Sequence, residues 1–330
     1  YLSGDAGDDT YLFGAGDGHT TISNSDAGTG RNDVLRFLDG IDPSDVRATR
    51  SSTNMVLTIQ STGEVITVSS FFSGSRYELN AVEFADGTVW DTNTMKELVL
   101  EATTGADTIT GYGSDDTIDA LGGNDYLYGA GGNDTLSGGA GNDRVYGQNG
   151  NDVVNGDAGD DWVYGDAGDD VLNGGDGRDY VLGGTGNDTL RGGLGANDYL
   201  SGDAGDDTYL FGAGDGADTI YNYDTNLDSI DVVRFDDALI EDLWFSRNGN
   251  NLQITTGGTD DSVTISNWYS NANYQLDRIE VGSSVLLNSQ VDQLVSAMAS
   301  FSIPNGEGNI IAQETKDQLQ PVLAVTWQTV

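Results

Sequence analysis

The stretch Gly138 to Tyr146, GGAGNDRVY, holds the pattern that decides the fold. Glycines precede Asp143, and an apolar residue, Val145, follows it two positions later. The arrangement returns every nine residues, so the chain carries an internal repeat of the kind found in stacked coil architectures. The repeated aspartates are Asp107, Asp116, Asp125, Asp134, Asp143, Asp152, Asp161, Asp170, Asp179 and Asp188, followed after a one-residue shift at Ala196 by Asp198 and Asp207.

Each repeat has the composition of one tight turn and one short strand. Glycine adopts the positive φ angles of such turns, and in a three-residue strand the middle side chain points to the opposite face from its neighbours. Two repeats therefore make one coil of eighteen residues and place alternate aspartates along two edges. Stacked coils lie about 4.8 Å apart, where unpaired carboxylates repel one another strongly. A hard divalent cation held by carboxylate and carbonyl oxygens removes that repulsion.

The repeats resemble the repeats-in-toxin (RTX) nonapeptide G-G-x-G-x-D-x-U-x, in which U is a large apolar residue. The resemblance covers Thr104 to Phe211 and a shortened unit from Tyr1 to Leu12. It implies an all-β fold with a right-handed parallel β-roll that binds several Ca²⁺ ions through aspartates and nearby glycine carbonyls. One implied site combines the Gly132 carbonyl and Asp134 with the Gly147 carbonyl and Asp152. The implied metal-binding residues are Asp9, Asp107, Asp116, Asp125, Asp134, Asp143, Asp152, Asp161, Asp170, Asp179, Asp188, Asp198 and Asp207, with Gly123, Gly129, Gly132, Gly138, Gly141, Gly147, Gly150, Gly156, Gly159, Gly165, Gly168, Gly174, Gly177, Gly183, Gly186 and Gly192.

Three departures from the nonapeptide pattern affect the ends of the repeats. Ser114 replaces the usual glycine before Asp116, so we expect the first coil to be poorly formed. Ala196 lengthens the last same-edge spacing to nineteen residues. Thr20 stands where the second copy of the motif has Asp218, so one liganding position is lost near the N-terminal end.

The first eighteen residues return letter for letter from Tyr199 to Gly216, which indicates a duplicated junction. Alternating apolar and polar residues follow each copy and resemble the small β-domain that accompanies haemolysin-type calcium-binding repeats, with FADGTVW (Phe84 to Trp90) as its best signature. Because Tyr1 lies inside the end of a roll, we expect further residues upstream of it. The predicted organisation is 1–22 as the end of a first roll, 23–101 as a β-domain, 102–222 as a second roll, 223–287 as a second β-domain, and 288–330 as a short helix and a tail resembling a type I secretion signal. A docking helix followed by a frayed end is the alternative interpretation of that tail.

Composition excludes several classes of function. A net charge of −41 at pH 7 disfavours nucleic acid and anionic membranes as partners, and no apolar run approaches the length of a membrane span. Cysteine is absent, which removes disulfides and thiolate metal sites. The one histidine, His19, accompanies no recognisable hydrolase or metalloprotease motif, so we expect no enzyme within this segment.

Aromatic side chains gather on one predicted face of the second roll. At eighteen-residue spacing, Tyr128, Tyr146 and Tyr164 are expected to stack in one ladder. The high β-propensity of tyrosine would by itself place aromatics on both faces. We expect a flanking β-domain to cover this face, with a protein partner, a second copy or a glycan as alternatives. The residues concerned are Tyr126, Tyr128, Tyr146, Trp162, Tyr164 and Tyr180.

The features together predict a secreted, extracellular or cell-surface protein segment. We expect a calcium-dependent folding and secretion module that forms the C-terminal region of a large RTX adhesin or toxin, exported by type I secretion machinery. The alternatives are a stabilising module of a secreted hydrolase and a self-assembling surface-layer or matrix protein. The upstream sequence would discriminate among these three.

Overall fold

The computed structural model describes residues 1–28, 30–195, 197–226, 228–302 and 310–329. The chain divides into two compact units, Tyr1–Glu101 and Ala102–Val330. Short β-strands dominate both units. Within the described ranges, no helix is long and apolar enough to cross a membrane.

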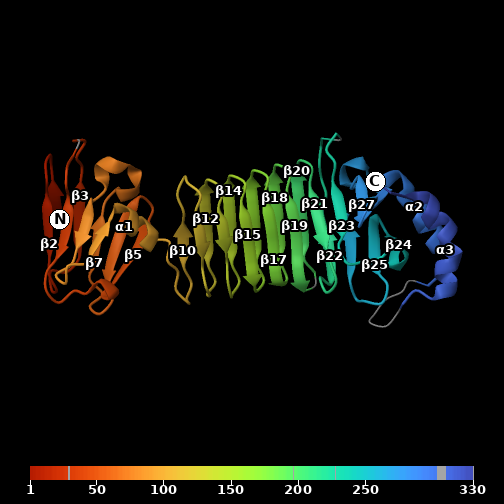
Figure 1. The fold of residues 1–330 in the computed structure, drawn as a ribbon, viewed down its shortest axis with the longest axis horizontal. Helices are drawn as coiled ribbons and strands as arrows, with labels where there is room; N and C mark the ends of the chain where they lie inside the picture. Colours follow the sequence, from red (N-terminus) through yellow and green to blue (C-terminus); the bar gives the residue numbers. More distant parts are fainter. Residues whose placement is uncertain (29, 196, 227, 303–309, 330) are drawn as a thin grey trace. The chain divides into compact units, whose positions relative to one another are not determined.

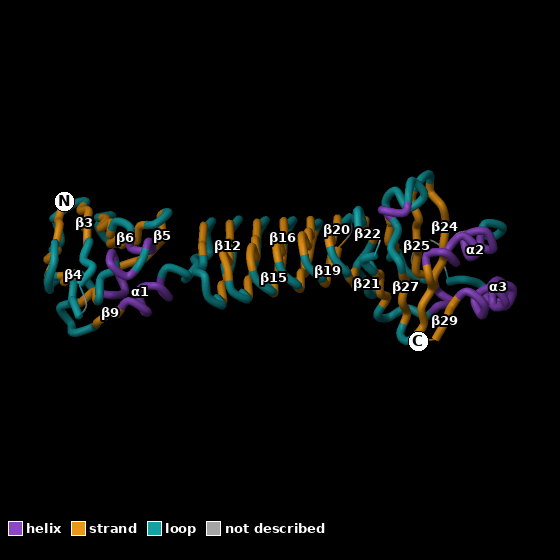
Figure 2. The backbone as a smooth tube through the Cα atoms, turned by 90° about the horizontal axis from the view of Figure 1, so that it is seen from above, coloured by secondary structure: helices purple, strands orange, loops and turns teal. Residues whose placement is uncertain are grey.

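The first part of the second unit is a parallel β-roll made of two sheets (Figures 1 and 2). Consecutive strands alternate between the sheets, and strands one coil apart pair in parallel, as Leu127 does with Val145. The all-β fold and its eighteen-residue coil are therefore confirmed. One sheet contains β10 (Thr108–Thr110), β12 (Tyr126–Gly131), β14 (Arg144–Asn149), β16 (Trp162–Ala167), β18 (Tyr180–Thr185) and β20 (Tyr199–Ala204); the other contains β11 (Thr117–Asp119), β13 (Thr135–Ser137), β15 (Val153–Ala158), β17 (Val171–Gly177), β19 (Thr189–Gly195) and β21 (Thr208–Phe211).

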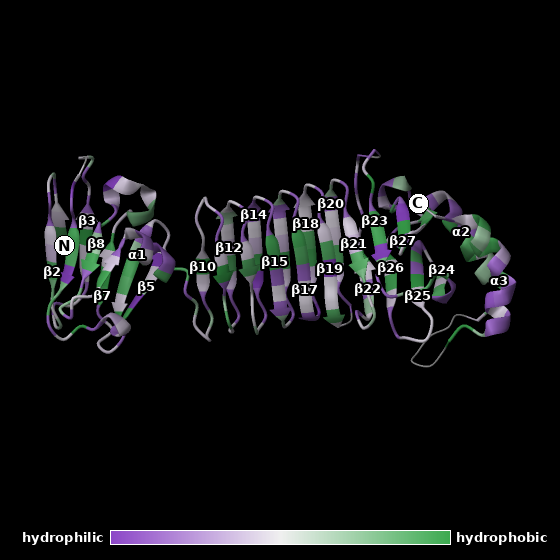
Figure 3. Ribbon diagram, in the orientation of Figure 1, coloured by the Kyte–Doolittle hydropathy of each residue, from purple (hydrophilic) through white to green (hydrophobic). Residues whose placement is uncertain are grey.

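One apolar side chain per repeat forms the core of the roll. Each is the second residue of its strand, and the residues beside it are exposed or half-buried except Ser201. Figure 3 shows hydrophobic colour along the strands with hydrophilic colour at the turns. Stacking these residues in register buries a continuous column that no single coil could bury alone. The buried residues are Ile109, Ile118, Leu127, Leu136, Val145, Val154, Val163, Leu172, Val181, Leu190, Leu200 and Tyr209.

Both sheets continue without a break into the following β-domain. On one side β22 (Ala217–Ile220) pairs with β20 and with β26 (Ser262–Ile265), which leads to β25 (Asn251–Thr256) and β24 (Leu243–Asn248). On the other side β21 pairs with β23 (Val232–Phe235), which pairs with β27 (Arg278–Val281) and leads to β28 (Ser284–Leu287). The segments 102–222 and 223–287 thus share two ten-stranded sheets, and the short 3-10 helices η4 (Ile240–Asp242) and η5 (Ala272–Tyr274) lie in the loops between strands.

The C-terminal segment contains more structure than its sequence indicates. The expected amphipathic helix is α2 (Asn288–Met298), which buries Val291, Leu294 and Met298. A second helix, α3 (Gln313–Thr326), and an edge strand, β29 (Trp327–Thr329), follow it, so the alternative of a frayed end is wrong. The segment IPNGEG, residues 303–308, whose proline and glycines predict an end to this helix, lies outside the described residues.

The first unit repeats the architecture of the junction. Strands β1 (Leu2–Gly4), β3 (Thr20–Asn24), β7 (Val65–Val68), β6 (Asn54–Ile59) and β5 (Val46–Ser51) form one sheet. The other consists of β2 (Thr10–Phe13), β4 (Val34–Phe37), β8 (Ala81–Glu83) and β9 (Val89–Asp91), after which α1 (Thr92–Leu98) begins. The strand order from β1 matches that from β20, and the order from β2 matches that from β21, so the sequence duplication is also a structural one. Small 3-10 turns lie at η1 (Pro43–Asp45), η2 (Phe71–Ser73) and η3 (Ser75–Tyr77).

Candidate metal centre

The repeated aspartates form two continuous ladders, one along each edge of the roll. In each step the Oδ1 atom of one aspartate accepts a hydrogen bond from the backbone N–H of the aspartate one coil earlier. Asp134 N–H donates to Asp152 Oδ1 (2.7 Å), and Asp152 N–H donates to Asp170 Oδ1 (2.7 Å). The ladder crosses the insertion at Ala196, itself outside the described residues, because Asp179 N–H still donates to Asp198 Oδ1 (2.8 Å). One carboxylate oxygen per aspartate is thereby used to hold neighbouring coils together.

The second oxygen of most of these carboxylates has no protein partner. Each Oδ2 atom is buried and accepts no hydrogen bond from any described residue, although burying a charged oxygen unpaired is costly. These orphaned atoms identify where a cation is needed. The aspartates concerned are Asp9, Asp125, Asp134, Asp143, Asp152, Asp161, Asp170, Asp179, Asp188, Asp198 and Asp207.

The glycine five positions before each aspartate leaves room next to the orphaned oxygen. An ideal Cβ built on Gly129 would lie 2.3 Å from Asp134 Oδ2 and 2.6 Å from the carbonyl oxygen of Gly147 in the next coil. The equivalent pair of oxygens flanks Gly165, on which an ideal Cβ would lie 2.3 Å from Asp170 Oδ2 and 2.7 Å from the Gly183 carbonyl oxygen. A side chain at these positions would fill the space between a carboxylate and a carbonyl. Glycines in this position include Gly129, Gly138, Gly147, Gly156, Gly165, Gly174, Gly183 and Gly192, the last lying six residues before Asp198 because Ala196 is inserted.

The other glycines implied as ligands by the resemblance occupy a different place. Gly150 has φ +133°, and an ideal Cβ on it would lie 1.7 Å from the carbonyl oxygen of Gly132 in the coil before. Only glycine allows the turns to stack at this distance. A Cβ on Gly129 would thus meet both Asp134 Oδ2 and the Gly147 carbonyl oxygen, whereas the Gly132 carbonyl oxygen faces Gly150. Glycines with this role are Gly123, Gly132, Gly141, Gly150, Gly159, Gly168, Gly177 and Gly186.

The first aspartates of the roll differ from those further along. Asp107 Oδ2 accepts hydrogen bonds from the backbone and hydroxyl of Thr103, and Asp116 Oδ2 accepts one from Tyr112 N–H. Their second oxygens are thus not orphaned. The first coil forms both of its strands next to Ser114, and each has three residues where β14 to β20 have six or seven.

Three glycines outside the predicted set occupy the same position as Gly129. Gly111 faces Asp116, and Gly202 faces Asp207. Gly4 faces Asp9 in the first unit. Their spacing of five residues before an aspartate is the signal that identifies them.

Burial and mutual repulsion make the carboxylates of the central coils hard to ionise. The pKa of Asp161 is raised to about 8, chiefly by burial and to a lesser degree by the carboxylates of Asp179 and Asp143, against the lowering effect of a backbone hydrogen bond from Asp143. Burial likewise raises the pKa of Asp170 to about 7. A cation beside these groups would favour the charged form.

The donor set fits calcium better than softer metals. Among the described residues, no three His, Cys, Asp or Glu side chains gather into one cluster. What each turn offers is one carboxylate oxygen and backbone carbonyls, the hard oxygen ligands that Ca²⁺ prefers. The residues present therefore fit a row of calcium ions, each of which would neutralise an orphaned carboxylate and tie two coils together.

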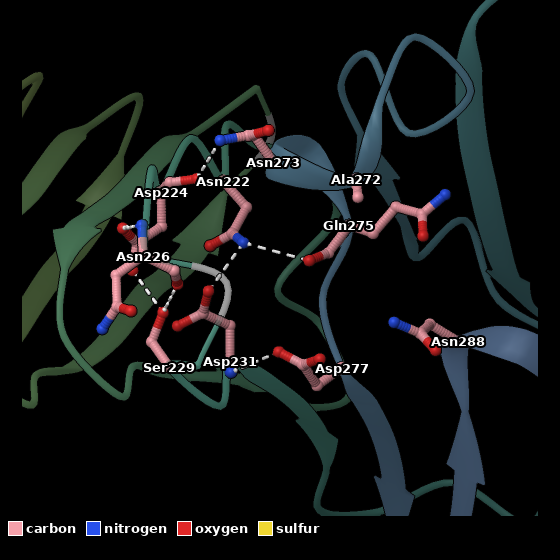
Figure 4. Close-up of a pocket in the computed structure, with 10 residues that line it drawn as sticks. All are labelled: Asn222, Asp224, Asn226, Ser229, Asp231, Ala272, Asn273, Gln275, Asp277 and Asn288. Atoms are coloured by element: carbon pink, nitrogen blue, oxygen red, sulfur yellow. Dashed lines mark hydrogen bonds between the residues drawn. The ribbon is translucent and has the colours of Figure 1, made fainter.

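One edge of the roll ends in a closed polar network (Figure 4). Asp207 N–H donates to Asp231 Oδ1 (3.1 Å), which extends the ladder past the last nonapeptide. Asn222 Nδ2 donates to Asp231 Oδ2 (2.8 Å), and the Tyr209 hydroxyl donates to Asn222 Oδ1 (2.9 Å). Beyond it lies a cavity of about 180 Å³ lined by Asn222, Asp224, Asn226, Ser229, Asp231, Ala272, Asn273, Gln275, Asp277 and Asn288. Protein donors thus satisfy both oxygens of Asp231, whose own N–H donates to Asp277 Oδ2 (3.1 Å).

The predicted aromatic ladder is present. The rings of Tyr128 and Tyr146 stack with centroids 5.1 Å apart and planes 7° apart, and those of Tyr146 and Tyr164 at 4.6 Å and 5°. Within the second unit, the β-domain leaves Tyr126 39% and Trp162 38% exposed. Because the inner rings cover one another's faces, they present edges and hydroxyls to solvent.

The comparisons with known proteins agree with this geometry. The model of the RTX calcium-binding nonapeptide repeat matches residues 1–19, 99–127, 128–163, 155–190, 164–197 and 182–217. The model of the haemolysin-type calcium binding protein related domain matches residues 54–94 and 251–281.

Two individual proteins are similar to parts of the chain. The iron-regulated protein FrpA of Neisseria meningitidis serogroup C is 41% identical over 112 residues, which are 33% of this chain and 10% of FrpA. The chain thus spans about a tenth of that relative. The crystal structure of extracellular lipase LipA from Serratia marcescens matches 78% of this chain and 36% of its own at 14% identity, with a TM-score of 0.21, a likeness too slight to bear on function.

RTX repeats are calcium-binding structural elements of proteins that are typically secreted by type I export. The nonapeptide matches coincide with the roll whose carboxylates are orphaned, and the related-domain matches coincide with the two β-domains. The chain belongs to the RTX haemolysin-type calcium-binding repeat proteins, and its repeats bind several Ca²⁺ ions.

Proposed function

We propose that this chain is a calcium-dependent folding and export module that forms the C-terminal region of a large secreted or cell-surface RTX protein, an adhesin or a toxin. The observation that carries the proposal is the row of buried aspartate Oδ2 atoms without partners. Without cations the row opposes folding, and with them each ion adds its binding free energy to the fold. Where calcium is scarce, the segment stays unfolded and can be translocated. Where calcium is abundant, it folds.

In this proposal the ion-binding residues and the segments of the chain have separate roles. The aspartates with orphaned oxygens and the glycines in the position of Gly129 hold the ions. Segment 102–222 supplies most of the sites, and 223–287 closes the end of the roll. Segment 288–330 carries the export signal. No catalytic role is assigned within the chain.

The secretion role requires that the signal be read before the protein folds. In the folded second unit, β29 pairs with β28, and α3 buries Leu319 and Leu323. Lys316 of α3 also pairs with Asp242 (2.5 Å). A receptor for an extended or helical C-terminal signal could not reach these residues in the folded state. Export would therefore precede calcium-driven folding.

A calcium titration followed by circular dichroism tests the folding part of the proposal. The expected result is that the protein in EDTA loses most of its β signal and regains it on addition of calcium. Extracellular sites of this type half-saturate at about 10⁻⁴–10⁻³ M. Magnesium at the same concentrations is the control, because it is smaller, keeps its water and fits such sites poorly. A chain that keeps its full β signal and melting temperature in EDTA would disprove the proposal.

Export is tested separately in cells that express type I secretion machinery. Deletion of residues 288–330 should abolish export, whereas Asp152→Ala, which weakens a central calcium site, should leave export in place and lower the yield of folded extracellular protein. Export of the truncated chain at the native level would show that the signal lies elsewhere.

A further inference from the structure

The cavity beside Asp231 has a counterpart in the duplicated first unit. In the second unit Asn222 Nδ2 donates to Asp231 Oδ2 (Figure 4), and in the first Asn24 Nδ2 donates to Asp33 Oδ2 (3.0 Å). In both units a tyrosine hydroxyl donates to the side-chain oxygen of the asparagine. The two cavities are therefore built on the same network, and the differences between them show what each one holds.

In the first unit a guanidinium group from the chain itself fills this place. Arg31 forms an ion pair with Asp33 Oδ2 through one nitrogen and donates to the backbone carbonyl of Ser75 through another. Its side chain is only 11% exposed. One planar cation thus bridges the segment that contains Asp33 and the segment that contains Ser75. At the position equivalent to Arg31, the second unit has the neutral hydroxyl of Ser229.

The cavity of the second unit is more acidic than its counterpart. Asp231 N–H donates to the carboxylate of Asp277 (3.1 Å), where Asp33 N–H donates to the neutral amide of Asn80 (2.9 Å). Three carboxylates line the cavity, those of Asp224, Asp231 and Asp277, and none of its lining residues is Lys or Arg. Like charges shielded from water repel one another strongly. A cation that enters the cavity therefore relieves this repulsion.

The hydrogen bonds of these carboxylates favour a guanidinium group over a metal ion. Asp224 and Asp231 accept protein hydrogen bonds at both of their oxygens, unlike the orphaned aspartates of the roll. In the part of the chain that the structure describes, no three acidic, His or Cys side chains converge on one point. A guanidinium group has five N–H donors in a plane and can reach separate acceptors. Asp33 Oδ2 shows that one such oxygen accepts both an amide and a guanidinium N–H.

The size and lining of the cavity agree with this choice. Its volume is about 180 Å³, against about 30 Å³ for one water molecule in the liquid, which is ample for a planar group of this kind. Ala272, the residue equivalent to Ser75, lies in the lining, as does Asn288 at the start of α2. Backbone and amide oxygens are thus available beside the carboxylates.

We propose that the cavity lined by residues from 222–231 and 272–277 binds a guanidinium group that comes from outside the chain. Free arginine and an arginine side chain of a peptide or protein offer the same chemistry. The first unit closes its cavity with Arg31, and the second leaves the equivalent place open to a ligand. This inference goes beyond calcium-dependent folding, because it assigns a binding site to the second β-domain.

Isothermal titration calorimetry of the full chain tests the proposal at saturating calcium, after circular dichroism has verified that the chain is folded. Arginine is the probe, lysine is a probe of the same charge with a different head group, and citrulline is an uncharged probe of similar shape. We expect saturable binding of one arginine per chain, weaker binding of lysine and none of citrulline. A tripeptide with arginine between two glycines distinguishes the sources. Tighter binding than that of free arginine identifies a side chain of a partner as the ligand, and weaker binding identifies the free amino acid.

Two variants convert features of the second cavity into those of the first. Ser229→Arg supplies an internal guanidinium group and is expected to abolish arginine binding. Asp277→Asn keeps an acceptor for Asp231 N–H, as Asn80 does, and should weaken arginine binding about ten- to a hundredfold because one charged acceptor is lost. Asp237→Asn, the same change of charge at an exposed position, is the matched control and should bind arginine as the native chain does.

Three results would overturn the proposal. They are a folded native chain that does not bind arginine, lysine binding as tight as arginine binding, and native arginine affinity in Asp277→Asn. Displacement of arginine by added calcium would also overturn it, because the cavity would then belong to a metal ion. If Ser229→Arg does not fold, the comparison of Asp277→Asn with Asp237→Asn decides alone. A native chain that does not fold in calcium would instead refute the proposed function, and circular dichroism shows this before arginine is added.

Discussion

Replacing Gly165 by alanine isolates the space next to one orphaned carboxylate. Gly165 has no positive φ, so its backbone dihedral angles are open to alanine, although the added methyl group must displace neighbouring atoms. Its Cβ would lie 2.3 Å from Asp170 Oδ2 and 2.7 Å from the Gly183 carbonyl oxygen. Calcium–oxygen distances are about 2.3–2.6 Å, so the methyl group would occupy the space that an ion bound to both oxygens needs. We expect Gly165→Ala to lose one calcium ion per chain.

The size of the effect follows from linkage between binding and folding. At 10 mM calcium, a site with a dissociation constant of about 10⁻⁴–10⁻³ M contributes about 1.4–2.7 kcal/mol to stability. For a unit of this size, about 2–4 °C of melting temperature is lost per kcal/mol, so the expected decrease is about 3–11 °C. Differential scanning calorimetry at fixed calcium measures the decrease, and equilibrium dialysis measures the ion count.

Gly113→Ala is the matched control for this prediction. Gly113 belongs to the same roll, has no positive φ, and an ideal Cβ on it meets no atom within 4 Å. It should keep the native ion count and melting temperature. If Gly165→Ala bound as many ions as the control and melted at the same temperature, the assignment of Gly165 to an ion site would be refuted.

Three further predictions follow from the same geometry. Asp152→Ala should raise the calcium midpoint in a circular dichroism titration more than Asp116→Ala does. A central coil is stabilised by two neighbouring coils, and the second oxygen of Asp116 already has a protein donor. Equal shifts of the two midpoints would contradict this prediction. In EDTA, lowering the pH from 8 to 5 should restore part of the β signal. Burial raises the pKa of Asp161 to about 8 in the folded state, above its unfolded value of 3.8. The free-energy cost of burying its charged carboxylate is therefore greatest above pH 8 and declines as the pH falls. An unchanged or weaker β signal at pH 5 would contradict this prediction. Tyr209→Phe should lower stability by about 1–3 kcal/mol in urea unfolding at constant calcium, because it leaves both hydrogen-bond partners of the hydroxyl unsatisfied; native stability would show that the closure of the roll does not depend on it.

The roll could be predicted because its period, its core and its turns are all local in the sequence. One nine-residue unit contains the turn glycines, the aspartate and the buried residue. The place of Val145 in its unit therefore predicts that it faces the core, and its eighteen-residue spacing from Leu127 predicts that the two residues pair in neighbouring strands. Neither inference needs knowledge of distant residues. The stacked tyrosines follow from the same spacing.

The ends of the roll could not be predicted in this way because their partners are distant in sequence. Asp207 is completed by Asp231, twenty-four residues later, across a loop with no repeat to indicate the register. Helix α3 contains Pro321, which argues against a helix in the sequence. Its buried leucines and the ion pair of Lys316 with Asp242 hold it in place, and both depend on tertiary contacts.

The two glycines of each nonapeptide show why a motif can be recognised correctly and still be understood incompletely. In sequence, Gly147 and Gly150 are equivalent letters of one turn. In the structure Gly147 has no positive φ, and an ideal Cβ on it would lie 2.4 Å from Asp152 Oδ2, so its lack of a side chain leaves the space that we propose for the ion. Gly150 has φ +133°, and an ideal Cβ on it would lie 1.7 Å from the Gly132 carbonyl oxygen. Its lack of a side chain therefore allows the coils to stack. A side chain at the Gly147 position would fill the space beside the carboxylate oxygen while the backbone dihedral angles of the turn stay allowed. A side chain at the Gly150 position would prevent the turn from stacking on the coil before it. The same residue type therefore supports metal binding at one position and folding at the other, and only the contact made with the neighbouring coil distinguishes them.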